Sequence, residues 1–397
     1  MKSNYKSIGE LVERIDQRNT DGKVTNLIGV SIDKRFIPSV ANVIGTDLTK
    51  YKVIEKYDFA VSLMQVSRDE KIPVACQTDF DKAIMSPAYP IFRVKDTNVI
   101  LPEYLEMWFM RPEFDREASF IAVGGVRGSM PWDDFANMKL PVPSIMEQHE
   151  IVSGYKAITE RIKLKKQIND NLVETANTLF CKFFIANEEK KNWEEGSFSQ
   201  MLIDTVGGDW GQETPSGNYI CEVSCIRGTD IPALNLGSIS DAPTRYILEK
   251  NFNAKKICSN NMVVEISGGS PIQATGRIAL VPEQILSYRG SNIICSNFCR
   301  VLKVNKDYLY FFLQNWLYLY RNGVMFNYEN SSTGLKNFNF NAFTEEHTIL
   351  IPPKDLSIKF NTLIEPIYKE IFNVGFEIEH LQSTLEHILP RIMSVGI

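Results

Sequence analysis

The cysteines are the residues whose spacing most directly suggests chemistry, because thiolates bind zinc and act as nucleophiles. The chain has seven, and two pairs stand four positions apart, Cys221 with Cys225 and Cys295 with Cys299. Zinc knuckles usually place two residues between their cysteines in hydrophilic turns, whereas CEVSC and CSNFC lie in strand-like surroundings. We therefore predict reduced thiols, buried or without a role, and no metal site.

Acidic and histidine side chains offer other routes to catalysis. Asp58, Glu265, Asp133 and Asp134 would suit a nuclease only if the fold gathered them, and their spacing gives no sign of that. The histidines form no H-E-x-x-H pattern; they are His149, His347, His380 and His387. No catalytic residue is therefore predicted.

Motifs for bound nucleotides and cofactors are absent from the sequence. The chain has neither G-x-x-x-x-G-K-[ST] nor a G-x-G-x-x-G that follows a strand. Its Pro-Pro pair, residues 352–353, follows isoleucine and precedes lysine. It therefore lacks the Asn or Asp with which a DNA amino-methyltransferase holds its target amine. We predict a non-catalytic chain that binds no cofactor.

Composition limits the class of protein. Hydrophobic residues make up 44% and charged residues 23%, as in ordinary globular proteins, and 397 residues suffice for two or three domains. The N-terminus has no signal-peptide core and no stretch approaches 18 apolar residues, so we expect a cytoplasmic protein without membrane spans. The net charge of −5 gives no basic excess, so any DNA binding must rely on local basic clusters or on a partner.

Several sequence blocks recur in the same order in the two halves of the chain. Each block alone is a weak match, but the shared order favours an internal duplication. The pairs are GTDL at 45–48 with GTDI at 228–231, EYLEMWF at 103–109 with DYLYFFL at 307–313, GGVRGSMPWDDF at 124–135 with TGLKNFNFNAF at 333–343, and LPVP at 140–143 with LIPP at 350–353. The aromatic blocks at 103–110 and 307–320 predict helices whose rings pack in a core rather than stack on bases.

A long helix is predicted after each half. Ser144 and Glu147 fit a capping box at the start of the first helix. Apolar residues then recur at alternating steps of four and three in both segments, a period that favours an antiparallel coiled coil of the two helices. The predicted seam contains Ile151, Ile158, Ile162, Leu172, Leu179, Phe360, Ile364, Ile367, Ile371, Ile378, Leu381, Leu385 and Ile388.

Two residues interrupt the first apolar stripe, and two others depart from good helix formers in the second segment. Lys165 and Asn169 are polar at seam positions, where they would set the register or mark a place where the helices splay to admit a partner. Pro366 and Gly375 should bend or weaken the second helix locally. The stripes are nevertheless long enough to keep the prediction of two paired helices.

These elements predict an α+β protein in which two similar globular domains are separated by two long helices with pseudo-twofold symmetry. The domains cover residues 1–143 and 187–353. The helices cover residues 144–186 and 354–397. A stiff pair of helices would hold the two domains at a fixed distance, whatever that distance serves.

The first junction carries the most specific signal. There LPVP is followed by EQ at 147–148 and IV at 151–152, and a Gly-rich segment precedes Trp132 and Phe135. With the duplicated layout, these features make essentially the whole chain resemble the specificity subunit of type I restriction-modification systems. The second junction departs from the pattern because PPKDLSIKF lacks the Glu-Gln pair, which leaves the details of the second partner contact open.

The resemblance implies a DNA reader without catalytic activity of its own. Each globular domain would be a target recognition domain that reads one half of a bipartite site in double-stranded DNA. The helices would form the spacer, and each end would dock one of two methyltransferase subunits, which use S-adenosylmethionine on adenine. The motor-nuclease subunits would join through the methyltransferases. Near-neutral charge is compatible with this role because the assembled complex can share the phosphate contacts.

Arg, Lys, Asn, Gln and Ser on loops are the side chains that match base edges and phosphates. The residues that we expect to contact DNA are Lys34, Arg35, Arg68, Gln77 and Arg127 in the first domain, and Trp210, Arg227, Gln273, Arg277, Ser332, Lys336 and Asn337 in the second. Arg127 and Lys336 occupy matched positions in the Gly-rich blocks, where exposed backbone can approach phosphate closely.

Two other classes of function remain open at this point. A structural adaptor could display two protein-binding domains on a helical rod, and an enzyme could use a site without a known motif. Any one of the expected DNA contacts could equally be an ordinary solvated side chain. The recognised bases cannot be read from the sequence, because target recognition domains of one architecture read unrelated sequences.

Overall fold

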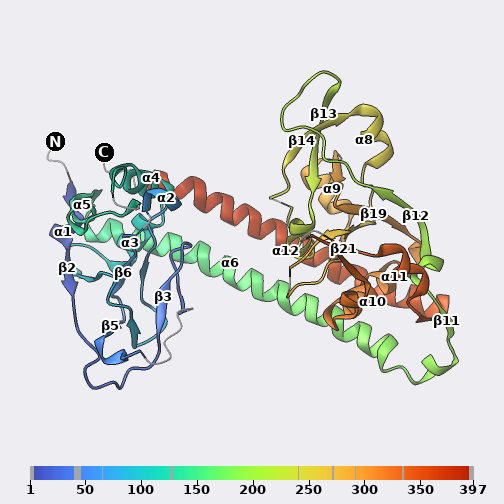
Figure 1. Cartoon of the computed structure of the whole chain (residues 1–397), viewed down its shortest axis with the longest axis horizontal. Helices are drawn as coiled ribbons and strands as arrows, with labels where there is room; N and C mark the ends of the chain where they lie inside the picture. The colour runs from blue at the N-terminus through green and yellow to red at the C-terminus, as the bar shows by residue number, and fades with distance from the viewer. Residues whose placement is uncertain are drawn as a thin grey trace. The chain divides into compact units, whose positions relative to one another are not determined.

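The computed structural model describes residues 4–39, 46–64, 66–125, 128–239, 241–270, 272–290, 292–332 and 335–392. The chain divides into two compact units (Figure 1). The first unit comprises Met1–Glu160 with Ser383–Ile397, and the second unit comprises Arg161–Gln382. Across the described ranges, no helix combines the length and apolar character needed to cross a membrane.

The first unit is built on a four-stranded antiparallel sheet. Its strands lie in the order β2 (Val12–Ile15), β9 (Ile91–Val94), β6 (Phe59–Val61) and β7 (Val74–Cys76). The helices are α1 (Ile8–Leu11), α2 (Val66–Asp69), α3 (Pro102–Phe109), α4 (Pro112–Ile121) and α5 (Trp132–Asn137). Three two-stranded ladders complete the unit: β1 (Tyr5–Ser7) with β10 (Lys139–Pro141), β3 (Ile28–Val30) with β4 (Phe36–Pro38), and β5 (Lys52–Glu55) with β8 (Lys82–Met85).

The second unit also contains a four-stranded antiparallel sheet, with the order β12 (Leu202–Gly207), β19 (Cys299–Val304), β15 (Asn261–Glu265) and β17 (Ile278–Val281). Its other strands are β14 (Thr244–Leu248), β13 (Tyr219–Ile226) and β18 (Ile293–Cys295) in one sheet, β16 (Ser267–Gly268), β21 (Leu335–Phe338) and β20 (Glu329–Ser332) in another, and β11 (Glu194–Gly196) with β22 (Ile349–Ile351). Its shorter helices are α7 (Ile231–Leu234), α8 (Glu249–Lys255), α9 (Glu283–Arg289), α10 (Leu309–Arg321) and α11 (Phe340–Glu346).

The main sheets of the two units share one topology. In each, the strands that come first, fourth, second and third along the chain lie side by side in that order. A helix follows the fourth strand in both units, α3 in the first and α10 in the second, and both helices overlap the aromatic blocks expected to be helical. The rings pack in cores as predicted, since Phe109 and Trp316 are at most 1% exposed.

The two long helices are α6 (Ile145–Phe180), which continues as a π-helical turn over Cys181–Ile185, and α12 (Lys354–Ile392). The predicted capping box is confirmed, because the Ser144 backbone N–H donates to the Glu147 carboxylate across 2.9 Å. The Glu147 backbone N–H donates to the Ser144 hydroxyl in return, across 3.4 Å. Helix α12 continues through Pro366 and Gly375 without a break.

Within the second unit, side chains of α6 and of its π-helical extension contact side chains of α12. The rings of Phe184 and Phe360 lie 4.8 Å apart between centroids, and Lys165 pairs with Glu377 across 2.8 Å. Residue numbers fall along α6 while they rise along α12, so the two segments run antiparallel here. The apolar stripe of α12 is buried in this region but not at its end, since Phe360 is fully buried and Ile388 is 37% exposed.

A loop of the second unit occupies the place where the stripes are interrupted. Asn169, only 2% exposed, donates its side-chain amide to the Leu236 carbonyl oxygen across 2.8 Å. A Cβ on Gly375 would lie 2.4 Å from the same oxygen. Asn169 therefore binds the loop that follows α7, and Gly375 leaves space for the same loop.

We expect Gly375→Ala to lower the free energy of unfolding by about 1–3 kcal/mol, because the added methyl group would press on the backbone at Leu236 and Gly237. Gly154→Ala is the matched control, since Gly154 lies in α6 with open space around its Cβ position. That control should be neutral or stabilising by up to about 1 kcal/mol. Urea unfolding followed by tryptophan fluorescence measures both, and equal stabilisation by the two substitutions would contradict the close packing at Gly375.

Candidate functional site

A cavity of about 560 Å³ in the second unit brings several expected DNA-contacting residues together. Its lining includes Trp210, Arg227, Gln273 and Arg277. Arg227 follows β13, Arg277 precedes β17, and Ser296–Phe298 connects β18 to β19. The cavity is therefore formed by segments at strand ends, where side chains can project without breaking the sheet. We refer to it below as the second-unit cavity.

Arg277 is held in this cavity by a buried carboxylate. Its Nε donates to Glu265 Oε2 across 2.8 Å, and its Nη2 donates to Oε1 of the same side chain. Glu265 is 1% exposed, and it fits because Gly228 and Gly268 have no Cβ, which would lie within about 2.5 Å of its Oε1. These hydrogen bonds raise the pKa of Arg277. In the described part of the chain, its Nη1 has no hydrogen-bond partner and remains able to donate.

Arg227 is oriented in the same way. Its Nε and Nη2 donate to the carboxylate of Asp230 across 3.0 and 2.8 Å, and Nη2 also reaches the Asp241 carbonyl oxygen at 2.8 Å. The hydrogen bonds to Asp230, which is 3% exposed, raise the pKa of the arginine. Each arginine fork is thus fixed in direction before any ligand arrives, which reduces the entropy that binding would cost.

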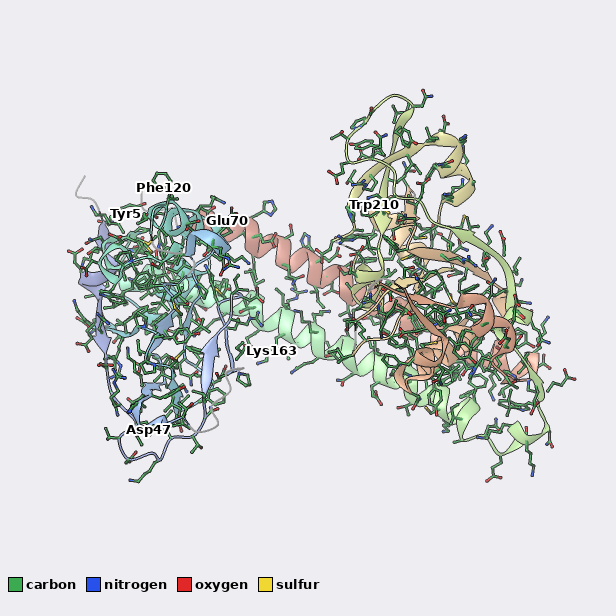
Figure 2. All side chains as sticks on the ribbon, in the orientation of Figure 1. Tyr5, Asp47, Glu70, Phe120, Lys163 and Trp210 are labelled. Atoms are coloured by element: carbon green, nitrogen blue, oxygen red, sulfur yellow. The ribbon has the colours of Figure 1, made fainter. Side chains whose placement is uncertain are left out.

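Aromatic rings stand beside these donors. Trp210, which Figure 2 labels, is 36% exposed, and the Arg245 guanidinium lies 4.3 Å from the centre of its ring. Arg245 also donates to the Trp210 carbonyl oxygen across 2.9 Å, so the indole is well positioned. Phe298, another lining residue, is 50% exposed. Planar groups can stack on such rings while the arginines donate hydrogen bonds.

The charge of the second-unit cavity is nearly balanced. Arg277 is paired with Glu265, and Arg227 is paired with Asp230. Such a site attracts phosphate only weakly, because phosphate binding depends on excess positive charge. It is better suited to hydrogen-bond acceptors on a planar edge, which Arg recognises through its fork of donors.

Three further expected residues belong to the neighbouring β16–β21–β20 sheet. Lys336 pairs with Glu329 across 2.8 Å, and its side chain lies against the backbone at Gly269, a lining residue of the cavity. Asn337 accepts a hydrogen bond from Ser267 Oγ at 2.5 Å. Ser332 forms part of β20, and its side chain lies outside the described atoms. Sequence analysis thus selected residues that the fold places in one region.

The expected residues of the first unit do not gather in this way. Lys34 is 6% exposed and pairs with Asp115 across 2.8 Å, and burial lowers its pKa. Gln77 is fully buried and donates to the Phe80 carbonyl oxygen across 3.0 Å. Arg35 and Arg68 are exposed, while Arg127 lies outside the described residues. Lys34 and Gln77 therefore hold loops in place within the unit and do not face outward.

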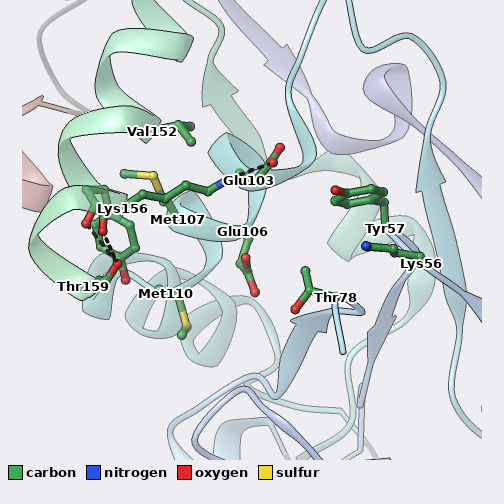
Figure 3. A pocket seen from close by; sticks show the side chains of 11 residues that line it. Lys56, Tyr57, Thr78, Glu103, Glu106, Met107, Met110, Val152, Lys156 and Thr159 are labelled. Carbon is green, nitrogen blue, oxygen red and sulfur yellow. Dashed lines mark hydrogen bonds and ion pairs between the residues drawn. The ribbon is translucent and has the colours of Figure 1, made fainter. Parts of the chain in front are cut away.

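Sequence analysis missed a cavity of about 450 Å³ in the first unit (Figure 3). It lies between α3, the start of α6 and the segment after β5. Lys156 reaches across to Glu103 with a 3.0 Å hydrogen bond, and Glu106 lines the same space. Burial raises the pKa of Glu106 to about 7. The available signal was a pair of glutamates three positions apart on an otherwise apolar helix, a spacing that places both on one face.

The raised pKa of Glu106 predicts a dependence of stability on pH. The folded state keeps this carboxyl protonated between its unfolded pKa of 4.5 and about 7. The unfolded state releases the proton in that range, so stability falls as the pH rises through it. We expect Glu106→Gln to remove this fall and to leave the protein about 1–3 kcal/mol more stable than the parent at pH 8.

Urea unfolding of the Glu106→Gln variant and the parent at pH 4.5 and pH 8 measures this effect. Glu10→Gln is a control of opposite sign, because hydrogen bonds from Ser7 lower the pKa of Glu10. Its carboxylate contributes stability above the unfolded pKa, so the control variant should be less stable than the parent at pH 8. If the Glu106→Gln variant is no more stable than the parent at pH 8, the charged Glu106 carboxylate does not destabilise the folded state, and the prediction is wrong.

The alternatives that involve cysteines and carboxylates gain no support from the geometry. Burial raises the pKa of Cys225 and Cys299 to about 12, which leaves them as thiols at neutral pH. Asp58 pairs with Arg93 in the first unit, and Glu265 pairs with Arg277 in the second. No group of three or more His, Cys, Asp or Glu side chains that could hold a metal occurs among the described residues.

Comparison with known proteins supplies independent information. No family model matches the chain. Over 310 residues it is 23% identical to the MjaIX specificity subunit, a type I restriction enzyme subunit of Methanocaldococcus jannaschii, and the match covers 74% of this chain and 68% of that one. It is 22% identical over 186 residues to the HindI specificity subunit of Haemophilus influenzae, a match that covers 45% of this chain and 40% of the relative.

A solved structure shares the fold. The S subunit of the type I restriction-modification system from M. genitalium superposes with a TM-score of 0.57 at 12% sequence identity, and the match covers 99% of this chain and 96% of that one. This similarity supports the mixed α and β architecture of the chain. Together with the curated relatives, it confirms the resemblance to type I specificity subunits that the sequence motifs had indicated.

Proposed function

We propose that this chain is the sequence-specific DNA-binding subunit of a type I restriction-modification complex. The observation that carries the proposal is the second-unit cavity, where Trp210, Arg227, Gln273 and Arg277 meet. Two arginine forks held by buried carboxylates are suited to base edges, and the exposed rings beside them are suited to apolar contact with bases.

Each unit would read one half of a bipartite site. The shared strand order of the two main sheets supports an internal duplication. In the second unit we assign base contacts to Arg227, Gln273 and Arg277, and contacts with the DNA backbone to Lys336. In the first unit the best candidates are the exposed Arg35, between β3 and β4, and the exposed Arg68, in α2, together with Arg127.

The helices α6 and α12 would form an antiparallel coiled coil that separates the two reading units. The Phe184–Phe360 ring contact and the Lys165–Glu377 ion pair support this arrangement within the second unit. Each end would dock one methyltransferase subunit, which binds S-adenosylmethionine and modifies adenine, and motor-nuclease subunits would join through these. The chain itself would bind no cofactor. Its net charge of −5 is compatible with DNA binding because the partners would supply further phosphate contacts.

Exchange of reading units tests the proposal. We expect replacement of residues 1–143 by the first unit of another such subunit to change one half of the methylated site completely and to leave the other half unchanged. The expectation follows because base contacts within one unit are independent of the other. Genome-wide methylation sequencing, in cells that also contain the cognate methyltransferase subunit, measures both halves together.

The reciprocal exchange of residues 187–353 is the control, and it should change only the opposite half. Two outcomes would contradict the proposal. Alteration of both halves by either exchange would rule out independent reading, and an unchanged site after both exchanges would indicate that another subunit reads the DNA. An adaptor protein would give the second outcome.

A further inference from the structure

Ile272 is the most exposed large apolar side chain among the described residues, at 93%. A single exposed apolar residue is common on protein surfaces and has no meaning by itself. The position of Ile272 suggests a role in binding, because the next residue, Gln273, lines the second-unit cavity with Arg227 and Arg277. Ile272 therefore belongs to a loop that contributes to the region to which we assign base contacts.

The loop that carries Ile272 is held firmly at its base. Ser270 and Gln273 exchange backbone hydrogen bonds of 3.0 and 3.2 Å, which hold these two residues together on either side of the tip. Thr275 donates to Glu329 through both its backbone N–H and its hydroxyl, across 2.6 and 2.9 Å. An apolar tip on a stem fixed in this way can enter a ligand without first being ordered.

Helix α10 anchors the same stem from the core of the unit. Trp316, which is fully buried, donates its Nε1 to the Gly276 carbonyl oxygen across 2.8 Å. Tyr320 donates to the Ala274 carbonyl oxygen across 2.9 Å. Gly276 adopts a φ of +85°, a conformation that side chains rarely allow, and a Cβ there would press on the Phe338 ring. The loop is thus connected through hydrogen bonds and packing to the main core.

The surroundings of Ile272 combine apolar surface with hydrogen-bond donors. Trp210 and Phe298 line the neighbouring cavity and are 36% and 50% exposed. Lys336 lies over the ring of the exposed Phe326 at 5.0 Å and beside the backbone at Gly269. Aliphatic side chains that stand among basic and amide groups are the type that proteins insert between stacked bases. This mixture favours nucleic acid over an apolar protein partner.

We propose that Ile272 enters between two neighbouring base pairs of bound double-stranded DNA and unstacks them, while Arg227, Gln273 and Arg277 contact the adjacent base edges. The proposal rests on the proposed DNA-binding function and deepens it. Unstacking is easiest at pyrimidine–purine steps such as TA and CA, so the loop would add selectivity for the deformability of one step, without a hydrogen bond to its bases.

Fluorescence of 2-aminopurine tests the wedge, because this base becomes brighter when it loses a stacking neighbour. The probe is a set of duplexes that contain the site found by methylation sequencing, each with 2-aminopurine at one position of the half read by the second unit. The protein is the complete chain in complex with its methyltransferase subunits. We expect bound wild-type protein to raise the fluorescence at one step of that half-site.

Three variants make the test specific. Ile272→Ala should abolish the rise in fluorescence and weaken binding to the site about tenfold, whereas Ile272→Leu should preserve both. Ile203→Ala is the matched control, because Ile203 is 71% exposed on β12 and does not line the cavity, and it should behave as wild type. Both positions are at the surface, so these substitutions should leave folding intact.

The possible failures can be told apart. Specific binding by wild-type protein without increased fluorescence at any position would overturn the wedge and leave the proposed function standing. Absence of specific DNA binding by the wild-type complex would overturn both. If Ile272→Ala left DNA binding and fluorescence unchanged but separated the chain from its methyltransferase subunits, the residue would belong to a protein interface and the wedge would be rejected.

Discussion

Arg277→Met is expected to lower the free energy of unfolding by about 3–5 kcal/mol. The substitution leaves Glu265, which is 1% exposed, without its cationic partner. A buried carboxylate that loses its ion pair keeps the cost of desolvation without the attraction that offset it. Water cannot easily replace the guanidinium, because Gly228 and Gly268 pack directly against the same carboxylate oxygen. Urea unfolding at pH 7 measures the loss.

The double variant Arg277→Met, Glu265→Met separates stability from recognition. Replacement of both members of a buried ion pair by apolar residues is often nearly neutral, so we expect the double variant to recover to within about 1–2 kcal/mol of the parent. Its binding to the methylated site should nevertheless stay weaker by about tenfold or more, because the donor that Arg277 keeps free at Nη1 is lost. A double variant that is stable and binds the site as tightly as wild type would show that Arg277 has only a structural role.

The position of Arg277 in the second-unit cavity shows which features of such a site can be predicted from the sequence. Residue type and loop context were sufficient to select Arg227, Gln273 and Arg277, and the fold places all three in one cavity. The same reasoning selected Lys34 and Gln77, which are buried. Their partners, Asp115 and the Phe80 carbonyl oxygen, are set by tertiary packing that no local pattern of residues reveals.

The same distinction between local and distant causes applies to the fold. Features with a local cause were predictable: the capping box at Ser144, the aromatic helices α3 and α10, and the two long helices. Features that depend on contacts between distant segments were not. Asn169 looked like an irregularity in an apolar stripe and Gly375 like a weak point in a helix, and the reason for both is the loop at Leu236, which is 67 residues from Asn169 in the sequence.

The position of that loop determines how the proposed spacer should be lengthened. Insertions close to Asn169 or Gly375 would disturb the contacts with Leu236 and destabilise the second unit itself. Insertion after Glu160 in α6 and after Gln382 in α12 avoids this problem, because both positions fall at the boundaries between the compact units. A heptad at each position preserves the apolar phase of a coiled coil, whereas two added residues would misplace it.

We expect the doubly extended protein to methylate sites whose half-sites are farther apart than in the parental site. Seven helical residues add about 10 Å at 1.5 Å per residue, and DNA rises about 3.4 Å per base pair, so the upper bound is about three base pairs. The change will be smaller if the helices run at an angle to the DNA. A control with two-residue insertions should lose activity, because the apolar faces would no longer meet. Methylation sequencing that finds an active, doubly extended protein at sites of parental spacing would exclude the helices as the determinant of spacer length.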